Sequence, residues 1–347
     1  MRPVDQRPAR STLSRRRFVG TAGAGAALAG LGLGIGRGQA QALRPLSFQL
    51  SWVKSIQYGG YFAGLDQGFF HREGIDPTFS SGGPNIDGVA NVAAGRSQMG
   101  DRPIGPILLG REKGMPIKVI ATVFQTNPFA IMTLANKPIK TVKELAGKTV
   151  AVSSSSQPLM AHLLRDAGLD PASVNLVPSS PDPAALVAGT IDAYCGYATN
   201  QGVMLKTRGI DIYTLYVQDL GMPETSGTIY ATEAFLAANR DLVVKFLRAA
   251  VASWTWALDH PAETARLMVD KYGVPGLDYQ AQFTEIQVSK PFITSGAAEK
   301  TGLLSIDPAL YDKIIALYRD VGMIKSDMTG QSLCDTSFIT EALKTSS

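Results

Sequence analysis

Hydrophobic and polar positions first form a regular pattern near residue 46. Apolar residues from Leu46 to Trp52 alternate with polar or small ones, which is the period of a half-buried β-strand. Residues 60–67 follow with a helical pattern that stops at Gly68, a residue suited to the left-handed conformation that ends many helices. The segment predicts a strand followed by a helix.

The same alternation continues along the chain. Residues 75–79 form a second predicted strand, and Ser81 to Pro84 a turn that leads to a helix starting at Asn85. The Asn85 side chain is a good N-cap because its oxygen can accept from the first free amides of a helix. Strands that alternate with amphipathic helices in this way predict an α/β fold with largely parallel sheets.

A short pattern occurs twice, 94 positions apart. Residues 92–100 and residues 186–194 both contain a helix end, a glycine stop and a short apolar strand. The similarity is too short to prove a duplication, and it fits two lobes of similar design.

We place the crossings between the two lobes from changes in pattern. The apolar run that begins at Phe129 gives way to polar residues near residues 132–136, and a second crossing is expected near residues 228–232. Lobe 1 is therefore predicted to comprise residues 43–132 plus 232–347, and lobe 2 residues 133–231. Only helical patterns follow the second crossing, and we expect them to cover lobe 1; they span residues 236–258, 261–272, 279–288 and 308–321.

Residues 1–42 have the pattern of an export signal. Ser14 to Val19 contain paired arginines before a bulky apolar residue, and a weakly hydrophobic stretch precedes small residues at Ala40 and Ala42. These features predict a twin-arginine signal peptide, the twin-arginine translocase as a partner and a periplasmic mature protein. The stretch is glycine-rich and shorter than the about 20 apolar residues of a membrane span, which leaves a transmembrane anchor as the alternative.

The charge of the protein changes when that segment is set aside. Residues 1–42 contain seven of the 33 basic residues and one of the 29 acidic residues, so the formal charge of +4 becomes −2 for the remainder. A slightly acidic protein gives no reason to expect nucleic acid or an anionic membrane surface as a partner. We expect a monomer.

Few residues suit redox or metal chemistry. The two cysteines, Cys195 and Cys334, lie 139 positions apart; an oxidising compartment permits their pairing, but two free buried thiols are the prediction. The three histidines, His71, His162 and His260, show no metal-binding spacing. We therefore expect neither a metal site nor a cofactor.

Polar and aromatic residues follow several predicted strands. Open α/β sheets bind ligands beyond the carboxyl ends of their strands, so these residues are expected to face one cleft. The predicted ligand-binding residues are Trp52, Gln57, Tyr58, Tyr61, Gly83, Asn85, Asp101, Arg102, Ser153, Ser154, Ser155, Ser156, Tyr194, Tyr197, Asn200 and Gln201.

Their side chains suggest different roles. Trp52 and the tyrosines can sandwich a flat ring, and the serine run can present hydroxyls and amides to a ligand oxygen or anion. Each has a structural alternative: the aromatic residues can belong to a lobe core, the serines to a helix cap, and Asp101 and Arg102 to an ion pair within one lobe. Whether Cys195 contacts the ligand stays open.

Several of these segments, taken together, resemble a known family. They are Trp52, residues 61–63, 68–75, 94–95, 143–148 and 246–249, and Trp254. Their order and spacing are similar to those of the SsuA/THI5-like (NMT1) solute-binding proteins, and the similarity extends over about residues 44–330. The resemblance implies a two-lobed, type II-like periplasmic-binding-protein fold, with a small-molecule ligand held between the lobes and delivered to an ABC permease and its ATPase.

Members of that family bind nitrate, sulfonates or heterocycles such as thiamine-pyrimidine and riboflavin-type precursors. One tryptophan with several tyrosines favours a flat, mostly neutral heterocycle over a small anion. Pyrimidine-binding members tend to have an acidic residue where this chain has Asn200 and Gln201, a departure that puts the pyrimidine itself in doubt.

Two other functions remain as alternatives. The family also includes the thiamine pyrimidine synthase, an enzyme that uses iron and pyridoxal phosphate, but its cysteine-rich segment is replaced here by residues 194–197 with one cysteine. A receptor that senses a ligand for a signalling partner would use the same lobe closure. We expect a binding protein rather than an enzyme.

Overall fold

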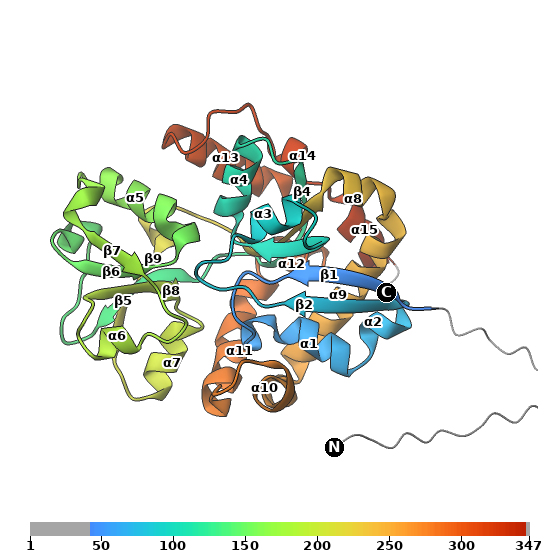
Figure 1. Cartoon of the computed structure of the whole chain (residues 1–347), viewed down its shortest axis with the longest axis horizontal. Helices are drawn as coiled ribbons and strands as arrows, with labels where there is room; N and C mark the ends of the chain where they lie inside the picture. Colours follow the sequence, from blue (N-terminus) through green and yellow to red (C-terminus); the bar gives the residue numbers. More distant parts are fainter. Residues whose placement is uncertain (1–41, 345–347) are drawn as a thin grey trace, which may run out of the picture. The chain divides into compact units, whose positions relative to one another are not determined.

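The computed structural model describes residues 42–344, which form two five-stranded sheets within one compact unit. The predicted twin-arginine signal and its cleavage site therefore lie outside the described residues, apart from Ala42. We call the first sheet with the helices packed on it the first lobe, and the second sheet with its helices the second lobe (Figure 1). No helix within residues 42–344 is long and apolar enough to cross a membrane.

The first sheet has the strand order β2-β1-β3-β10-β4. Strand β1 lies parallel to β2 and β3, whereas β10 lies antiparallel to both of its neighbours, β3 and β4. The strands are β1 (Arg44–Gln49), β2 (Ile75–Ser80), β3 (Met99–Arg102), β4 (Ile117–Phe124) and β10 (Ser226–Thr232).

The second sheet repeats this arrangement in the order β7-β6-β8-β5-β9. Strand β6 lies parallel to β7 and β8, and β5 lies antiparallel to β8 and β9. The strands are β5 (Phe129–Leu134), β6 (Thr149–Val152), β7 (Asn175–Pro178), β8 (Ala193–Tyr197) and β9 (Ile212–Tyr216).

The first lobe is built around an aromatic cluster. Phe48 of β1 lies 5.2 Å from Tyr61 and 5.5 Å from Phe246, measured between ring centroids, and Tyr61 stacks on Phe79. Such ring pairs contribute packing beyond their buried area. Tyr61 lies on α1 and Phe246 on α9, so the cluster fixes these two helices against the sheet.

The helices of the first lobe come from both ends of the described chain (Figure 1). From the N-terminal half come α1 (Gly59–Asp66), α2 (Phe69–Arg72), α3 (Gly88–Ala93) and α4 (Ile104–Glu112), preceded by the 3-10 turn η1 (Ile56–Tyr58). After β10 come α8 (Glu233–Ala238), α9 (Arg240–Asp259), α10 (Pro261–Leu267), α11 (Tyr279–Thr294), α12 (Gly296–Thr301), α13 (Pro308–Asp320), α14 (Gly330–Leu333) and α15 (Ser337–Lys344), with a π-helical turn at Met268–Tyr272.

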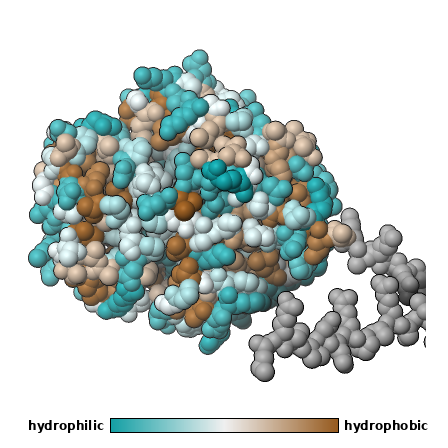
Figure 2. Space-filling model, in the orientation of Figure 1, coloured by the Kyte–Doolittle hydropathy of each residue, from teal (hydrophilic) through white to brown (hydrophobic). Residues whose placement is uncertain are grey.

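The second lobe has shorter connections. Its helices are α5 (Gln157–Asp166), α6 (Ala184–Val187) and α7 (Gln201–Thr207), and its 3-10 turns are η2 (Val142–Leu145), η3 (Ser154–Ser156), η4 (Pro171–Ser173) and η5 (Val217–Leu220). Strand β9 is partly exposed along its whole length. On the face drawn in Figure 2, apolar side chains form separate patches among polar ones.

Both crossings between the lobes occur earlier in the chain than predicted, as the sheet to which each strand belongs shows. Residues 129–134 form β5 of the second sheet, and residues 226–232 form β10 of the first. The crossings expected at residues 132–136 and 228–232 therefore occur before these strands, because each apolar run is a central strand rather than the last strand before a crossing. The residue ranges of the lobes otherwise stay a prediction.

Three local predictions also need correction. The helix expected to start at Asn85 starts at Gly88, where the Asp87 carboxylate accepts from the amide of Ala90 and acts as N-cap. The short strands expected within residues 92–100 and 186–194 are β3 and β8, which end two and three residues farther toward the C-terminus. Gly68 has the predicted left-handed conformation, with φ 70°.

The predicted C-terminal helices are present. The pattern over residues 236–258 is two helices, α8 and α9, which break at Asn239. Cys195 and Cys334 are both buried and unpaired, as predicted.

Candidate ligand-binding site

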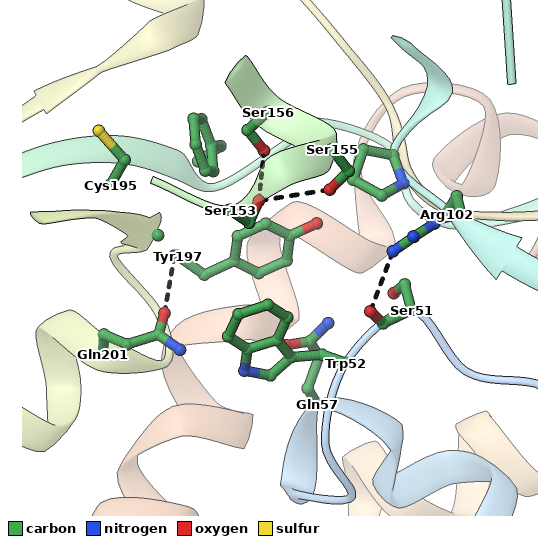
Figure 3. A pocket seen from close by; sticks show the side chains of 13 residues that line it. Ser51, Trp52, Gln57, Arg102, Ser153, Ser155, Ser156, Cys195, Tyr197 and Gln201 are labelled. Carbon is green, nitrogen blue, oxygen red and sulfur yellow. Dashed lines mark hydrogen bonds between the residues drawn. The ribbon is translucent and has the colours of Figure 1, made fainter. Parts of the chain in front are cut away.

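Loops from both lobes line one cavity (Figure 3). Its cavity volume is about 60 Å³, within about 490 Å³ of empty space that includes open solvent. The lining residues are Ser51, Trp52, Gln57, Arg102, Pro103, Phe129, Ser153, Ser155, Ser156, Cys195, Gly196, Tyr197 and Gln201. Eight of the sixteen predicted ligand-binding residues are among them.

The loop after β1 supplies the indole of the first lobe. Trp52 is partly buried, and its Nε1–H is fully buried with no hydrogen-bond partner within residues 42–344. A buried donor of this kind is costly unless it finds an acceptor. The indole offers a ligand an apolar ring at the cavity wall.

Arg102 and Asp101 fix the start of that loop. The Asp101 carboxylate accepts from the backbone amide of Ser51 at 2.9 Å, and Nη1 of Arg102 donates to the carbonyl of Ser51 at 3.1 Å. Nη2 of Arg102 donates to the carbonyl of Ile86, whereas its Nε has no partner within the described residues. Most of the guanidinium is thus used within the first lobe.

Asp101 itself does not line the cavity. Burial raises the pKa of its carboxyl to about 7, while the hydrogen bonds from Ser51 and the charge of Arg102 oppose that rise. Asp101 and Arg102 form no ion pair with each other within the described residues, and each bonds to the backbone of Ser51 instead; only Arg102 lines the cavity. They occupy the last two positions of β3, where successive side chains point to opposite faces.

The second lobe contributes hydroxyl groups. The Ser153 hydroxyl lies 3.3 Å from that of Ser155 and donates to that of Ser156 at 3.0 Å. Ser154 lines a neighbouring cavity instead, and its hydroxyl donates to the carbonyl of Pro84 in the first lobe at 2.7 Å. The serine run thus includes three cavity-lining hydroxyls and one contact between the lobes.

The end of β8 provides the ring of the second lobe. Oε1 of Gln201 accepts from the backbone amide of Tyr197 at 2.9 Å and so holds the strand end against the start of α7. The Tyr197 hydroxyl bonds to Ser226 of β10, which makes it a second contact between the lobes. Burial raises the pKa of the Cys195 thiol, which therefore stays protonated at neutral pH.

A third contact between the lobes lies away from the cavity. Nδ2 of Asn200 donates to the Glu285 carboxylate on α11 at 2.6 Å. Both side chains are buried, and burial raises the pKa of Glu285 to about 8, against the lowering effect of the Asn200 hydrogen bond. Asn200 therefore lies at a lobe contact rather than in the cavity wall.

The other predicted residues lie behind or beside the cavity. Tyr58 is buried, and its hydroxyl bonds to Ser51 at 2.8 Å and accepts from Gln57 at 3.1 Å, so it supports two lining residues. Tyr61 belongs to the aromatic core because it faces the sheet from α1. Gly83 is buried in the turn after β2, and Asn85 is exposed.

Tyr194 also faces away from the cavity. It is the second residue of β8, is buried in the core of the second lobe, and donates its hydroxyl to the carbonyl of Ser180 at 2.5 Å. The prediction placed it at the strand tip because the strand was placed about two residues too early. Tyr197, three positions on, is the residue at the tip.

Five lining residues escaped the sequence reasoning: Ser51, Pro103, Phe129, Cys195 and Gly196. Ser51, Pro103 and the pair at residues 195–196 are chain neighbours of predicted residues, so the correct strand ends would have included them. Phe129 begins β5, and no sequence pattern marked it as a site residue. It lies at the amino end of an antiparallel strand, and only the pairing of that strand within the sheet brings it to the cavity. No group of three or more metal-ligand side chains occurs within residues 42–344.

The fold is that of the two-lobed periplasmic binding proteins. The structure of the periplasmic aliphatic sulphonate binding protein SsuA from Escherichia coli aligns with a TM-score of 0.59 and 18% identity, over 85% of this chain and 92% of that chain. The predicted α/β, two-lobed fold is thereby confirmed.

The chain belongs to the NMT1/THI5 like family, whose model matches residues 55–264. It is similar to the riboflavin-binding protein RibY of Chloroflexus aurantiacus, at 25% identity over 305 residues, 86% of each chain. It is also similar to the formylaminopyrimidine-binding protein of Halalkalibacterium halodurans, at 24% identity over 233 residues, 66% of this chain and 71% of that protein.

An enzyme of the family matches more distantly. The 4-amino-5-hydroxymethyl-2-methylpyrimidine phosphate synthase of Schizosaccharomyces pombe is 22% identical over 232 residues, 63% of this chain and 67% of that protein.

Proposed function

We propose that this protein is the extracytoplasmic solute-binding component of an ABC importer and captures a small, flat, mostly neutral heterocycle without making or breaking bonds. The observation that carries the proposal is the cavity between the lobes, where Trp52 of the first lobe and Tyr197 of the second line the same space (Figure 3). Of the sixteen predicted residues, those that line the cavity are proposed to bind the ligand. The others are proposed to support the residues of the cavity wall.

The contacts between the lobes support capture by closure. Ser154, Tyr197 and Asn200 of the second lobe each bond to the first lobe. A ligand that touches both walls shifts an open–closed equilibrium toward the closed state, and a membrane partner can recognise the closed surface. The partners are an ABC permease and its ATPase.

The lining supports a neutral ring over a small anion. Trp52, Phe129 and Tyr197 offer aromatic surface, and Gln57, Gln201 and the serines offer hydrogen bonds at its edges. Arg102 lines the cavity but donates twice to backbone carbonyls, with the Asp101 carboxyl beside it in sequence. The riboflavin- and formylaminopyrimidine-binding relatives also favour a heterocycle.

The sequence supports an exported protein. Paired arginines at residues 15–17 precede the weakly hydrophobic stretch of a twin-arginine signal, so the translocase acts before the protein reaches the periplasm. The periplasmic SsuA structure has the same fold.

Calorimetric titration tests the ligand class directly. Purified protein should release or absorb heat with riboflavin or 4-amino-5-hydroxymethyl-2-methylpyrimidine, and give no signal with taurine or nitrate. Heat with the two anions alone would instead make it an anion-binding member of the family. The importer role is tested separately, because cells that lack the gene should lose uptake of whichever heterocycle binds.

A synthase-like enzyme is the second candidate, favoured by the match to the fungal synthase. The cavity-lining segment around Cys195 contains one cysteine, which favours binding over that chemistry. Metal analysis and an absorbance scan for bound pyridoxal phosphate distinguish the two, since an importer component should contain neither in stoichiometric amount.

A further inference from the structure

A second cavity lies beside the first and has a different chemical character. Pro103, Phe129, Ser155 and Ser156 line both cavities, so the two lie against the same four residues. The second cavity also reaches Gly105, Pro106, Leu109, Asn127, Pro158, Leu159, Glu224, Tyr318 and Met323. Its polar lining therefore includes a carboxylate, whereas the first cavity has none.

Glu224 is that carboxylate, and it is 5% exposed. Its Oε2 accepts from Nδ2 of Asn127 at 2.9 Å, and its Oε1 accepts from the Tyr318 hydroxyl. No lysine or arginine within residues 42–344 forms an ion pair with it. The backbone amide of Gly105 also bonds to it. An ionised carboxylate has about four acceptor sites, so these three donors leave about one site for a further donor.

The position of this carboxylate connects it to both lobes. Asn127 lies just before β5 and Glu224 just before β10, so the pair joins the two chain crossings. Ser155 and Ser156 enter the same cavity from the second lobe. A group held there would contact the crossings and the second lobe at once.

We propose that the second cavity, of about 20 Å³, is a subsite for one terminal hydroxyl on an arm of the ligand, whose flat ring lies between Trp52 and Tyr197 and whose hydroxyl donates to Glu224. This inference rests on the proposed function and extends it to the substrate class. A hydroxyl both donates and accepts, so the terminal hydroxyl of an arm can donate to the carboxylate and accept from the Ser155 or Ser156 hydroxyl that lines the same cavity. A plain ring without an arm leaves these groups unused.

Riboflavin and lumiflavin are suitable probes because they share one ring system. Riboflavin has a ribityl arm where lumiflavin has a methyl group. Quenching of flavin fluorescence gives both dissociation constants on the full mature protein. Wild type is expected to bind riboflavin at least tenfold more tightly, about the contribution of one hydrogen bond to a charged group.

Glu224→Gln is expected to weaken riboflavin binding about tenfold and to leave lumiflavin binding within twofold. Glu73→Gln is the control, because Glu73 is a partly buried carboxylate of the first lobe that pairs with Arg248 and lines neither cavity, and it should leave the ratio of the two affinities unchanged. Leu109→Phe is the substitute test if Glu224→Gln does not fold. It enlarges a side chain that lines the second cavity but not the first, so it should weaken riboflavin binding and leave lumiflavin binding unchanged.

The outcomes separate this inference from the proposed function. Equal binding of both flavins by wild type overturns the arm subsite and leaves a ring-binding protein. A riboflavin preference that survives both Glu224→Gln and Leu109→Phe also overturns it, because the arm is then recognised elsewhere. Binding of pyrimidines but of neither flavin overturns the subsite alone, whereas binding of no heterocycle at all overturns the proposed function as well.

Discussion

The two lobes share one topology but differ in what their loops and cores contain. Strands β2, β1, β3, β10 and β4 of the first sheet correspond in order and direction to β7, β6, β8, β5 and β9 of the second. The strand ends that face the cavity are therefore equivalent. The first lobe places an indole and a guanidinium there, and the second a tyrosine and several serine hydroxyls.

The two lobes also differ in how their cores are packed. The first lobe encloses the cluster of Phe48, Tyr61, Phe79 and Phe246 under α1 and α9, whereas the second lobe has the partly exposed edge strand β9. Large rings leave little room for adjustment in a closely packed interior. We infer that the first lobe is the more rigid wall of the site and the second the more adaptable one.

Three buried carboxyl groups of the first lobe differ from a surface carboxylate of the second. In the first lobe, burial raises the pKa of Asp101, Glu224 and Glu285. In the second lobe, hydrogen bonds from Arg208 lower the pKa of Asp182 at the surface. Ionisation of these three buried carboxyl groups thus destabilises the fold, whereas ionisation of Asp182 stabilises it.

The largest expected effect is a loss of folding stability that differs between the cores of the two lobes. In Gly60→Ala the new methyl group would overlap the Trp254 indole in the first lobe, so the free energy of unfolding should fall by about 1–3 kcal/mol. In Gly202→Ala of α7, the methyl group would lie 3.3 Å from the sulfur of Met132, a side chain that can adapt. That variant should change stability by less than about 1 kcal/mol. Urea denaturation measures both, and equal losses would contradict the difference in rigidity.

The second prediction concerns the aromatic walls. Trp52→Ala should weaken heterocycle binding at least tenfold, since an aromatic contact and its buried area are lost. Tyr197→Phe should have a smaller effect because the ring remains. Trp256→Ala is the control, as Trp256 stacks on His260 outside the cavity. Calorimetric affinities that fall more for Tyr197→Phe than for Trp52→Ala would reverse the assignment of the principal wall.

The third prediction uses pH. The folded protein keeps the Glu285 proton up to about pH 8, whereas the ordinary pKa is 4.5, so protonated Glu285 stabilises the fold at low pH. That stability is fully present below pH 4.5 and is lost as pH rises through 8.

Glu285→Gln should therefore reduce the loss of unfolding free energy between pH 5 and pH 8 by on the order of 1 kcal/mol or more. Denaturation at several pH values measures this change, and Asp182→Asn in the second lobe is the comparison. A wild-type slope that Glu285→Gln leaves intact would assign the pH dependence to Asp101 and Glu224.

The smallest expected effect concerns a lobe contact. Ser154→Ala removes the hydrogen bond to the Pro84 carbonyl and should weaken ligand binding about twofold to tenfold, the net contribution of one neutral hydrogen bond. Ser81→Ala, in the turn before Pro84, is the control because the Ser81 hydroxyl bonds only weakly to the adjacent Gly82 carbonyl, at 3.4 Å. An unchanged affinity in Ser154→Ala would mean that the Ser154 hydroxyl does not contribute to closure, since the Ser154 backbone amide still donates to the same carbonyl at 3.3 Å.

The fold was accessible from sequence because its signals are local. Alternation near residue 46, the left-handed Gly68 and the repeated pattern at residues 92–100 and 186–194 all correspond to observed elements, and that repeat precedes the equivalent strands β3 and β8. The crossings were misplaced because an apolar run does not reveal which sheet it joins. Pairing with distant strands decides that for β5 and β10.

The site was harder to predict because a shift of two residues changes which side chain occupies a strand tip. Tyr194 and Tyr197 have the same chemistry, yet one lies in the core and the other lines the cavity. Tyr61 has an aromatic environment that no local pattern reveals. Asn200 lies opposite Glu285, a residue 85 positions away, and only the packing of α11 brings the two together.

The place of β10 in the first sheet has a consequence for synthesis on the ribosome. Strands β3 and β4 are not neighbours, and β10 fills the gap between them with residues made about a hundred positions later. A nascent chain that has emerged only as far as Phe124 exposes two strand edges that must wait for the intervening segment. Such late pairing slows folding and leaves edges open to wrong partners, so the chain has to emerge past Thr232 before its first sheet can close.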